Sequence, residues 1–117
     1  MTEDWTSIVA RYAEAPTSDA SINGVAALAR HIRETSLSSG LFGWTSMFDL
    51  CITQTEALNP YDGPYLRVSP LPDGMVEFRY LDTRIAEQQW QRTVPAAECV
   101  ARLRGFLAQL HWFGELE

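Results

Sequence analysis

The first forty residues carry apolar side chains at the three- and four-residue spacing of α-helices. A first helix is predicted near the start of the chain, with Thr2 as its N-terminal cap and Pro16 as its boundary. A second helix is predicted to begin after Ser18 or Asp19 and to end at the serine- and glycine-rich segment 36–40. The apolar face of the first helix comprises Trp5, Ile8, Val9 and Tyr12. The apolar face of the second comprises Ile22, Val25, Ala26, Ala29 and Ile32.

Beyond this segment apolar and polar positions alternate, which is the period of a β-strand with one buried face. A first strand is predicted over residues 44–54, and its buried face comprises Trp44, Phe48, Leu50 and Ile52. The polar face carries Asp49, a residue type that is depleted in strands. We expect Asp49 to be solvated or paired with an arginine such as Arg67 or Arg79. If another element covers this face, the pKa of the carboxyl group would rise and Asp49 would become a candidate site.

Two further segments, 65–69 and 75–81, are predicted to pair as a hairpin around the turn-rich residues 70–74. The length of this loop predicts two apolar pairs on one face and one charged pair on the other. The predicted pairs are Leu66 with Phe78, Val68 with Val76, and Arg67 with Glu77. Turn length and side-chain pattern therefore agree on which face of the hairpin is buried.

A fourth strand is predicted over residues 88–94, with Trp90 and Val94 on one side. The pattern leaves its register open. A two-residue turn at positions 82 and 83 would aim Trp90 away from the face that Phe78 occupies.

A C-terminal helix is predicted to open at Thr93 and Pro95 and to end near Gly114. Its apolar stripe comprises Val100, Leu103, Leu107 and Leu110. These elements define an α+β fold: two N-terminal helices, an antiparallel meander of about four strands, and a C-terminal helix packed on one sheet face as a two-layer sandwich. We expect residues 1–117 to form a single domain. The sheet side chains expected beneath the helical stripe are Phe48, Leu50, Leu66, Val68, Val76 and Phe78.

Composition narrows the possible partners. Fifteen acidic and nine basic residues give a formal charge of −6, which opposes binding to the phosphates of nucleic acids. No apolar run approaches the length of a membrane helix, and the acidic residues at positions 3 and 4 are not typical of an export signal. We therefore expect a cytoplasmic protein with neither nucleic acid nor membrane as its partner. Cys51 and Cys99 are far apart in the sequence and are predicted to be reduced, buried thiols.

Several residue types that could carry chemistry are present, but their spacing matches no catalytic motif. The candidate nucleophiles are Cys51 and the serines Ser38, Ser39 and Ser46. The candidate bases are His31 and His111, and Asp49 would orient the base. No serine lies in a GxSxG elbow, and the cysteines and histidines are too dispersed for a local metal-ligand set. Neither a metal nor another cofactor is expected.

The sequence favours a non-enzymatic protein-binding module, for instance an inhibitor or a bacterial immunity-type protein that masks a basic partner. All nine basic residues are arginine, and the chain contains four Trp, four Tyr and five Phe. Arginine and aromatic residues are common anchors of protein interfaces. The expected surface, which would meet a partner or a second copy of the chain, comprises Asp49, Arg67, Glu77 and Arg79, with Tyr61 and Tyr65 at its rim.

Two alternatives remain open at this point. The first is a small-molecule-binding domain with a pocket between the helices and the sheet. The second is a small enzyme that uses Asp49 or Cys51.

Overall fold

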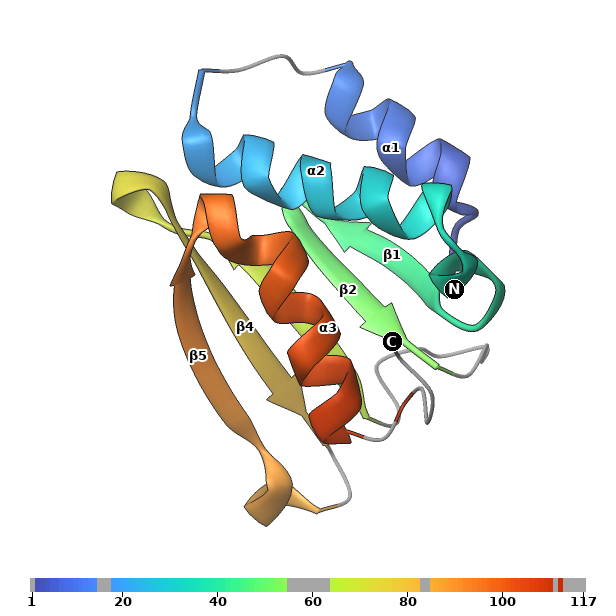
Figure 1. Cartoon of the computed structure of the whole chain (residues 1–117), viewed down its shortest axis with the longest axis vertical. Helices are drawn as coiled ribbons and strands as arrows, with labels where there is room; N and C mark the ends of the chain where they lie inside the picture. Colours follow the sequence, from blue (N-terminus) through green and yellow to red (C-terminus); the bar gives the residue numbers. More distant parts are fainter. Residues whose placement is uncertain (1, 15–17, 55–63, 83–84, 111, 113–117) are drawn as a thin grey trace.

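The computed structural model describes residues 2–14, 18–54, 64–82, 85–110 and 112 (Figure 1). Its α-helices are α1 (Trp5–Ala13), α2 (Ala20–Glu34) and α3 (Cys99–Leu110). Its sheet contains β1 (Phe42–Ser46), β2 (Asp49–Thr53), β3 (Tyr65–Pro70), β4 (Met75–Leu81) and β5 (Trp90–Pro95). The strands are antiparallel and follow one another in sequence order across the sheet. The predicted α+β fold with an antiparallel meander is confirmed.

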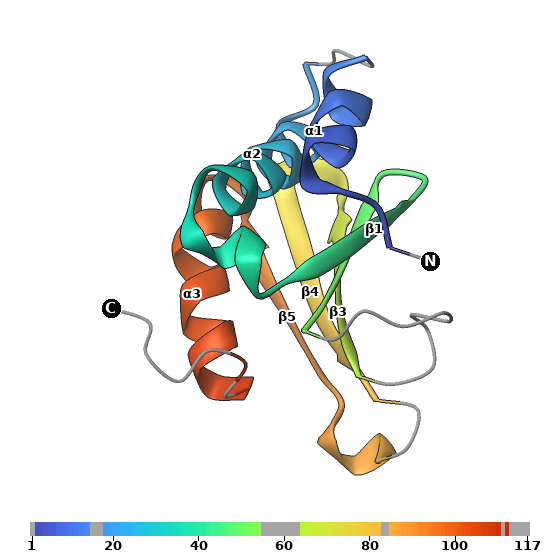
Figure 2. The ribbon, with the colours of Figure 1, turned by 90° about the vertical axis from the view of Figure 1, so that its right-hand side faces the viewer.

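The three helices lie on one side of the sheet (Figure 2). Helix α2 contacts β2, β3 and β4, while α1 flanks it over β1 and α3 lies beside β5. The hydrophobic core fills the space between these layers. Its fully buried side chains include Val25, Leu28 and Ile32 from α2, Leu50, Ile52, Leu66, Val68, Val76 and Phe78 from the sheet, and Leu103 and Leu107 from α3.

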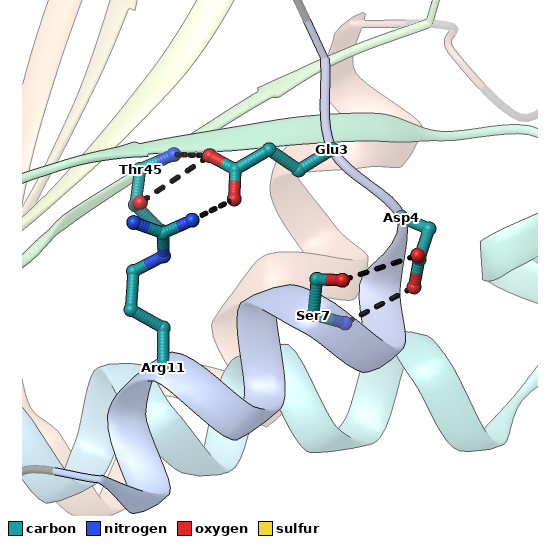
Figure 3. Close-up of polar contacts among 5 residues, drawn as sticks. All are labelled: Glu3, Asp4, Ser7, Arg11 and Thr45. Carbon is teal, nitrogen blue, oxygen red and sulfur yellow. Dashed lines mark hydrogen bonds and ion pairs between the residues drawn. The ribbon is translucent and has the colours of Figure 1, made fainter.

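The helix starts are set by aspartate caps. Helix α1 is capped by Asp4, whose carboxylate accepts from the N–H and the hydroxyl of Ser7 (Figure 3). The prediction that Thr2 caps this helix is wrong, because the residue after Thr2 is still paired with β1. Helix α2 begins as predicted, since Asp19 accepts hydrogen bonds from two N–H groups of the first turn. The 3₁₀ turn Ser36–Ser39 follows α2, where the serine-rich segment was expected to end it.

The N-terminal segment covers the outer edge of β1. The N–H of Glu3 donates to the carbonyl of Gly43 at 2.7 Å. The indole of Trp5 donates through Nε1 to the carbonyl of Leu41 at 2.9 Å. A Cβ atom added at Gly43 would lie 2.6 Å from Cη2 of Trp5, so glycine lets the indole lie directly against the strand.

The predicted single strand over residues 44–54 is wrong, because the chain reverses within it. Strand β1 ends at Ser46 and β2 begins at Asp49. Met47 and Phe48 therefore form a two-residue turn, and Met47 adopts a φ of 59°. A positive φ at the first central position is typical of a type II′ hairpin turn, where glycine is the usual residue.

This reversal changes the faces of two aromatic residues. Trp44, predicted to share the buried face of Leu50, lies opposite Cys51 on the other face of the sheet. Phe48, predicted to be in the core, is 42% exposed at the turn. Neither Met47 nor Phe48 is a turn-forming residue type, and for this reason the alternating pattern reads as one continuous strand.

The β3–β4 hairpin has the predicted faces but a different register. The observed pairs are Leu66 with Tyr80, Val68 with Phe78, Arg67 with Arg79, and Ser69 with Glu77. Each residue of β3 thus meets a partner two positions beyond the predicted one. Pro70 continues the strand and the turn contracts to Pro72–Gly74, with Asp73 and Gly74 both at positive φ. A shift of two residues keeps every side chain on its face, so the apolar side remains buried.

Strand β5 resolves the open register of the fourth predicted strand. Because β4 ends at Leu81 and β5 begins at Trp90, their connection is longer than a two-residue turn and includes the 3₁₀ turn Ala86–Gln88. Trp90 lies opposite Tyr80 on the helix side of the sheet. Its ring centroid is 5.1 Å from that of Phe106 in α3.

Helix α3 buries most of the predicted stripe. Leu103 and Leu107 are completely buried, whereas Val100 and Leu110 are partly buried. Phe106, which the stripe omits, is also in the core and packs against the ring of Phe78. The predicted helix end at Gly114 lies outside the described residues.

We predict that Leu103→Ala lowers the free energy of unfolding by roughly 2 to 5 kcal/mol, because it opens a cavity between α3 and the sheet. Denaturant unfolding measures this change. Leu110→Ala, at a partly buried position of the same helix, is the control and should cost less. An unchanged midpoint for Leu103→Ala would contradict the packing of α3 on the sheet.

We predict that Met47→Gly raises the free energy of unfolding, whereas Leu103→Ala lowers it. The Met47 side chain is 92% exposed, so its removal sacrifices little packing, while glycine adopts a positive φ without steric cost. After allowance for the greater freedom of glycine in the unfolded chain, the free energy of unfolding should rise by about 0.5 to 1 kcal/mol. A destabilised variant in the same denaturation assay would show that the Met47 side chain stabilises the fold.

Candidate functional site

The face of the sheet opposite the helices, here called the outer face, carries the residues expected to form a binding surface. Successive side chains of β2, β3 and β4 point to opposite faces, so that Leu50, Val68 and Phe78 lie in the core and the intervening residues lie on this face. Its central residues are Asp49, Cys51, Tyr65, Arg67, Ser69, Glu77 and Arg79. Tyr61, predicted at the rim of the same surface, lies outside the described residues.

Two ion pairs occupy the centre of the outer face. Nε of Arg67 lies 2.7 Å from Oδ2 of Asp49, which confirms that Asp49 is paired with one of the expected arginines. Nε of Arg79 lies 3.2 Å from Oε1 of Glu77. The predicted pairing of Arg67 with Glu77 across the hairpin is wrong, since Arg67 lies opposite Arg79 in the observed register.

The first ion pair is the more enclosed of the two. The Arg67 and Asp49 side chains are 19% and 24% exposed, whereas the Arg79 side chain is 36% exposed. Burial is the largest single influence on the pKa of Arg67 and would lower it, but the hydrogen bond and charge of Asp49 together with the interactions of Cys51 and Tyr65 outweigh burial, and the pKa is raised. Arg67 therefore stays charged and positions Asp49, while Arg79 is the more accessible guanidinium.

Two polar atoms in this region are buried without a hydrogen-bond partner among the described residues: Oγ of Ser69 and Nε of Arg79. The contact between Arg79 and Glu77 is close enough for an ion pair but lacks hydrogen-bond alignment. Unsatisfied buried polar atoms cost on the order of 1 to 3 kcal/mol each, and native proteins contain few of them. Both atoms are enclosed by the fold, so the part of Arg79 that another molecule can reach is the rest of its guanidinium group.

An aromatic cluster borders the charged residues. The rings of Trp44 and Tyr65 lie 5.3 Å apart and pack with Cys51, which is completely buried, and with Leu81. Tyr65 was expected at an exposed rim, but only 7% of it is accessible. Tyr65 is therefore packed within the aromatic cluster and does not project from the surface. Trp44 is a member of the site that the single-strand prediction missed.

Two hollows are large enough to be considered as ligand sites. One, of about 420 Å³, adjoins the accessible arginine and is lined by Arg79, Leu81, Gln89 and Gln91, together with Tyr80 and Trp90. The other, of about 450 Å³, lies between α2 and the start of α3. Small side chains line most of it, chiefly Ala20, Gly24, Ala27, Ala96, Ala97 and Val100. A pocket between helices and sheet was the expectation; this groove lies between helical elements instead.

The residues considered for catalysis are not brought together. Cys51 lies on the outer face, whereas His31 belongs to α2 on the opposite side of the sheet. The hydroxyls of Ser38 and Ser39 donate to backbone carbonyls of their own 3₁₀ turn and its cap. His111 lies outside the described residues. Among the residues that can be placed, no group of three or more His, Cys, Asp or Glu side chains could hold a metal ion.

Comparison of the chain with protein-family models, with curated proteins and with solved structures finds no match. Within the described part of the chain, no helix combines the length and apolar character needed to cross a bilayer.

The thiols give a testable consequence of burial. Burial raises the pKa of Cys51 to about 12 and that of Cys99 to about 11. Both thiols should be protonated at pH 8, and we predict slow reaction with a thiol reagent in the native protein and fast reaction after unfolding. Because the unfolded chain releases these protons first, stability should also fall as the pH rises above about 9. Fast native labelling of Cys51 would indicate a reactive cysteine and an enzymatic role.

Proposed function

We propose that this chain is a non-enzymatic protein-binding module whose outer face docks a basic protein partner, in the manner of an inhibitor or an immunity-type protein. The observation that carries the proposal is Arg79. Its side chain lies on the outer face of β4 opposite Arg67, and it is 36% exposed even though its Nε lies 3.2 Å from Glu77. Arginines of this kind, bordered by buried aromatic rings, are frequent anchors of interfaces.

Charge supports a basic partner. The chain has a net charge of −6, which favours encounter with a positively charged surface. Asp49 and Glu77 each use one carboxylate oxygen in the ion pairs of the outer face. Among the described residues no ion pair engages the second oxygen of either group, and a lysine or arginine of the partner would pair with it. Carbonyl groups of the same partner would accept from Arg79.

The hollow beside Arg79 supports docking at the same place. It is lined by the amide side chains of Gln89 and Gln91, which both donate and accept hydrogen bonds. A side chain of the partner that entered this hollow would come within reach of the guanidinium and of both amides. Convergence of polar groups beside an accessible arginine favours recognition of a protein surface over a purely apolar ligand.

Two other classes of ligand remain as outcomes of the test. A second copy of the chain carries the same charge of −6, so self-association works against electrostatic repulsion. A small apolar molecule fits the groove between α2 and α3, which has few polar groups to orient a ligand.

The test is affinity capture from the source cell with mass spectrometry, followed by binding measurements on the purified partner. We predict that Arg79→Ala weakens binding by more than about 1 kcal/mol, or roughly fivefold, because it removes a central anchor. Arg102→Ala is a matched control, since Arg102 forms an ion pair with Glu98 on the helical side of the molecule. Arg79 is preferred to Arg67 for substitution because loss of Arg67 would leave the half-buried Asp49 unpaired.

The proposal fails if capture finds no basic partner, or if Arg79→Ala and Arg102→Ala bind equally well. Sedimentation then decides whether the chain associates with itself. Thermal-shift screening with small molecules decides whether the groove between α2 and α3 binds a ligand.

A further inference from the structure

The tip of the β1–β2 hairpin exposes two large apolar side chains side by side. Met47 is 92% and Phe48 is 42% accessible, and among the described residues Ile85 is the other exposed large apolar side chain. Figure 2 shows the hairpin turn projecting from the sheet beside α1. Adjacent apolar residues at a projecting turn lose contact with water only when another molecule covers them.

The backbone of the tip is maintained against local preference. Met47 adopts a φ of 59°, although a side chain with a Cβ atom is disfavoured in that conformation. Because the side chain is exposed, packing within the fold does not compensate for this cost. An unfavourable conformation that places a large apolar group in solvent points to a role outside the fold.

Contacts with α1 hold the tip in place. The hydroxyl of Tyr12 donates to the carbonyl of Phe48 at 2.9 Å. Burial, and next the charge of Asp49, raise the pKa of Tyr12, so this hydroxyl stays protonated and remains a donor. Glu3 accepts from the backbone N–H and the hydroxyl of Thr45 in β1 and pairs with Arg11 of α1 (Figure 3). The hairpin is thereby braced on both sides of its turn.

We infer that Met47 and Phe48 form an apolar anchor that inserts into an apolar cleft of the basic protein partner. The inference rests on the proposed function and adds the contact that supplies apolar binding energy. The tip is continuous with the outer face, because Asp49 directly follows Phe48 and pairs with Arg67. A braced anchor loses little conformational entropy on binding, and the flexible thioether of methionine adapts to the shape of a cleft.

A protein cleft fits the tip better than a lipid surface does. The net charge of −6 repels anionic headgroups, and two side chains bury too little apolar area for stable membrane attachment. Near the tip Glu3 and Asp49 are paired with Arg11 and Arg67, so the preference for a basic partner comes from the net charge of −6.

Site-specific photo-crosslinking in the source cell tests this contact. The photoreactive amino acid p-benzoyl-phenylalanine is introduced at position 48 and, as a matched control, at position 85, where Ile85 is 45% exposed. We expect one basic protein to be crosslinked from position 48 and not from position 85. An absence of adducts at position 48, or the same adducts at both positions, would overturn the inference.

Binding of the purified crosslinked protein to Met47→Gly separates docking from folding. We expect affinity to fall at least tenfold while the midpoint of thermal unfolding stays unchanged or rises, and Ile85→Ala should bind like the unsubstituted chain. If Arg79→Ala weakens binding and Met47→Gly does not, the tip is not an anchor and the proposed function stands. If Met47→Gly weakens binding and Arg79→Ala does not, the tip is an anchor and the outer face is not the docking surface.

Discussion

The reversal of the chain within two residues, Met47 and Phe48, decides what each face of the sheet contains. In a strand that continued through this point, Trp44 would join Leu50 in the core. The two-residue turn instead pairs Trp44 with Cys51 on the outer face. The cluster that borders the charged residues exists only because of this turn. This turn is attached to α1, because the hydroxyl of Tyr12 donates to the carbonyl of Phe48.

The two faces of the sheet differ in how they are stabilised. The inner face is a hydrophobic core in which the largest side chains are completely buried, and its stability comes from removal of apolar surface from water. The outer face combines half-buried ion pairs with an aromatic cluster. Half-buried pairs contribute little net stability, because desolvation offsets most of their attraction. A polar arrangement of this kind is better explained by recognition than by folding.

The same arrangement argues against chemistry at Cys51. Cys51 is surrounded by packed side chains, and burial keeps its proton bound at neutral pH. Its possible base, His31, belongs to a helix on the other side of the sheet. A nucleophile needs a base within hydrogen-bond distance and access to a substrate. The residues considered for catalysis therefore do not form a catalytic arrangement in the described part of the chain.

The sequence by itself determined the class of fold and the buried faces of the helices and of the β3–β4 hairpin, because these follow from periodicity. For Asp49 it left solvation and pairing with an arginine open, and the tertiary structure decided for the pair with Arg67. The break at Met47 was not predictable, because neither turn residue carries the usual turn chemistry. Registers and accessibility, including the position of Arg67 opposite Arg79 and the burial of Tyr65, were decided by the tertiary structure. A strand pattern defines which side chains share a face, but which residues oppose one another depends on where the chain turns and on what packs against the sheet.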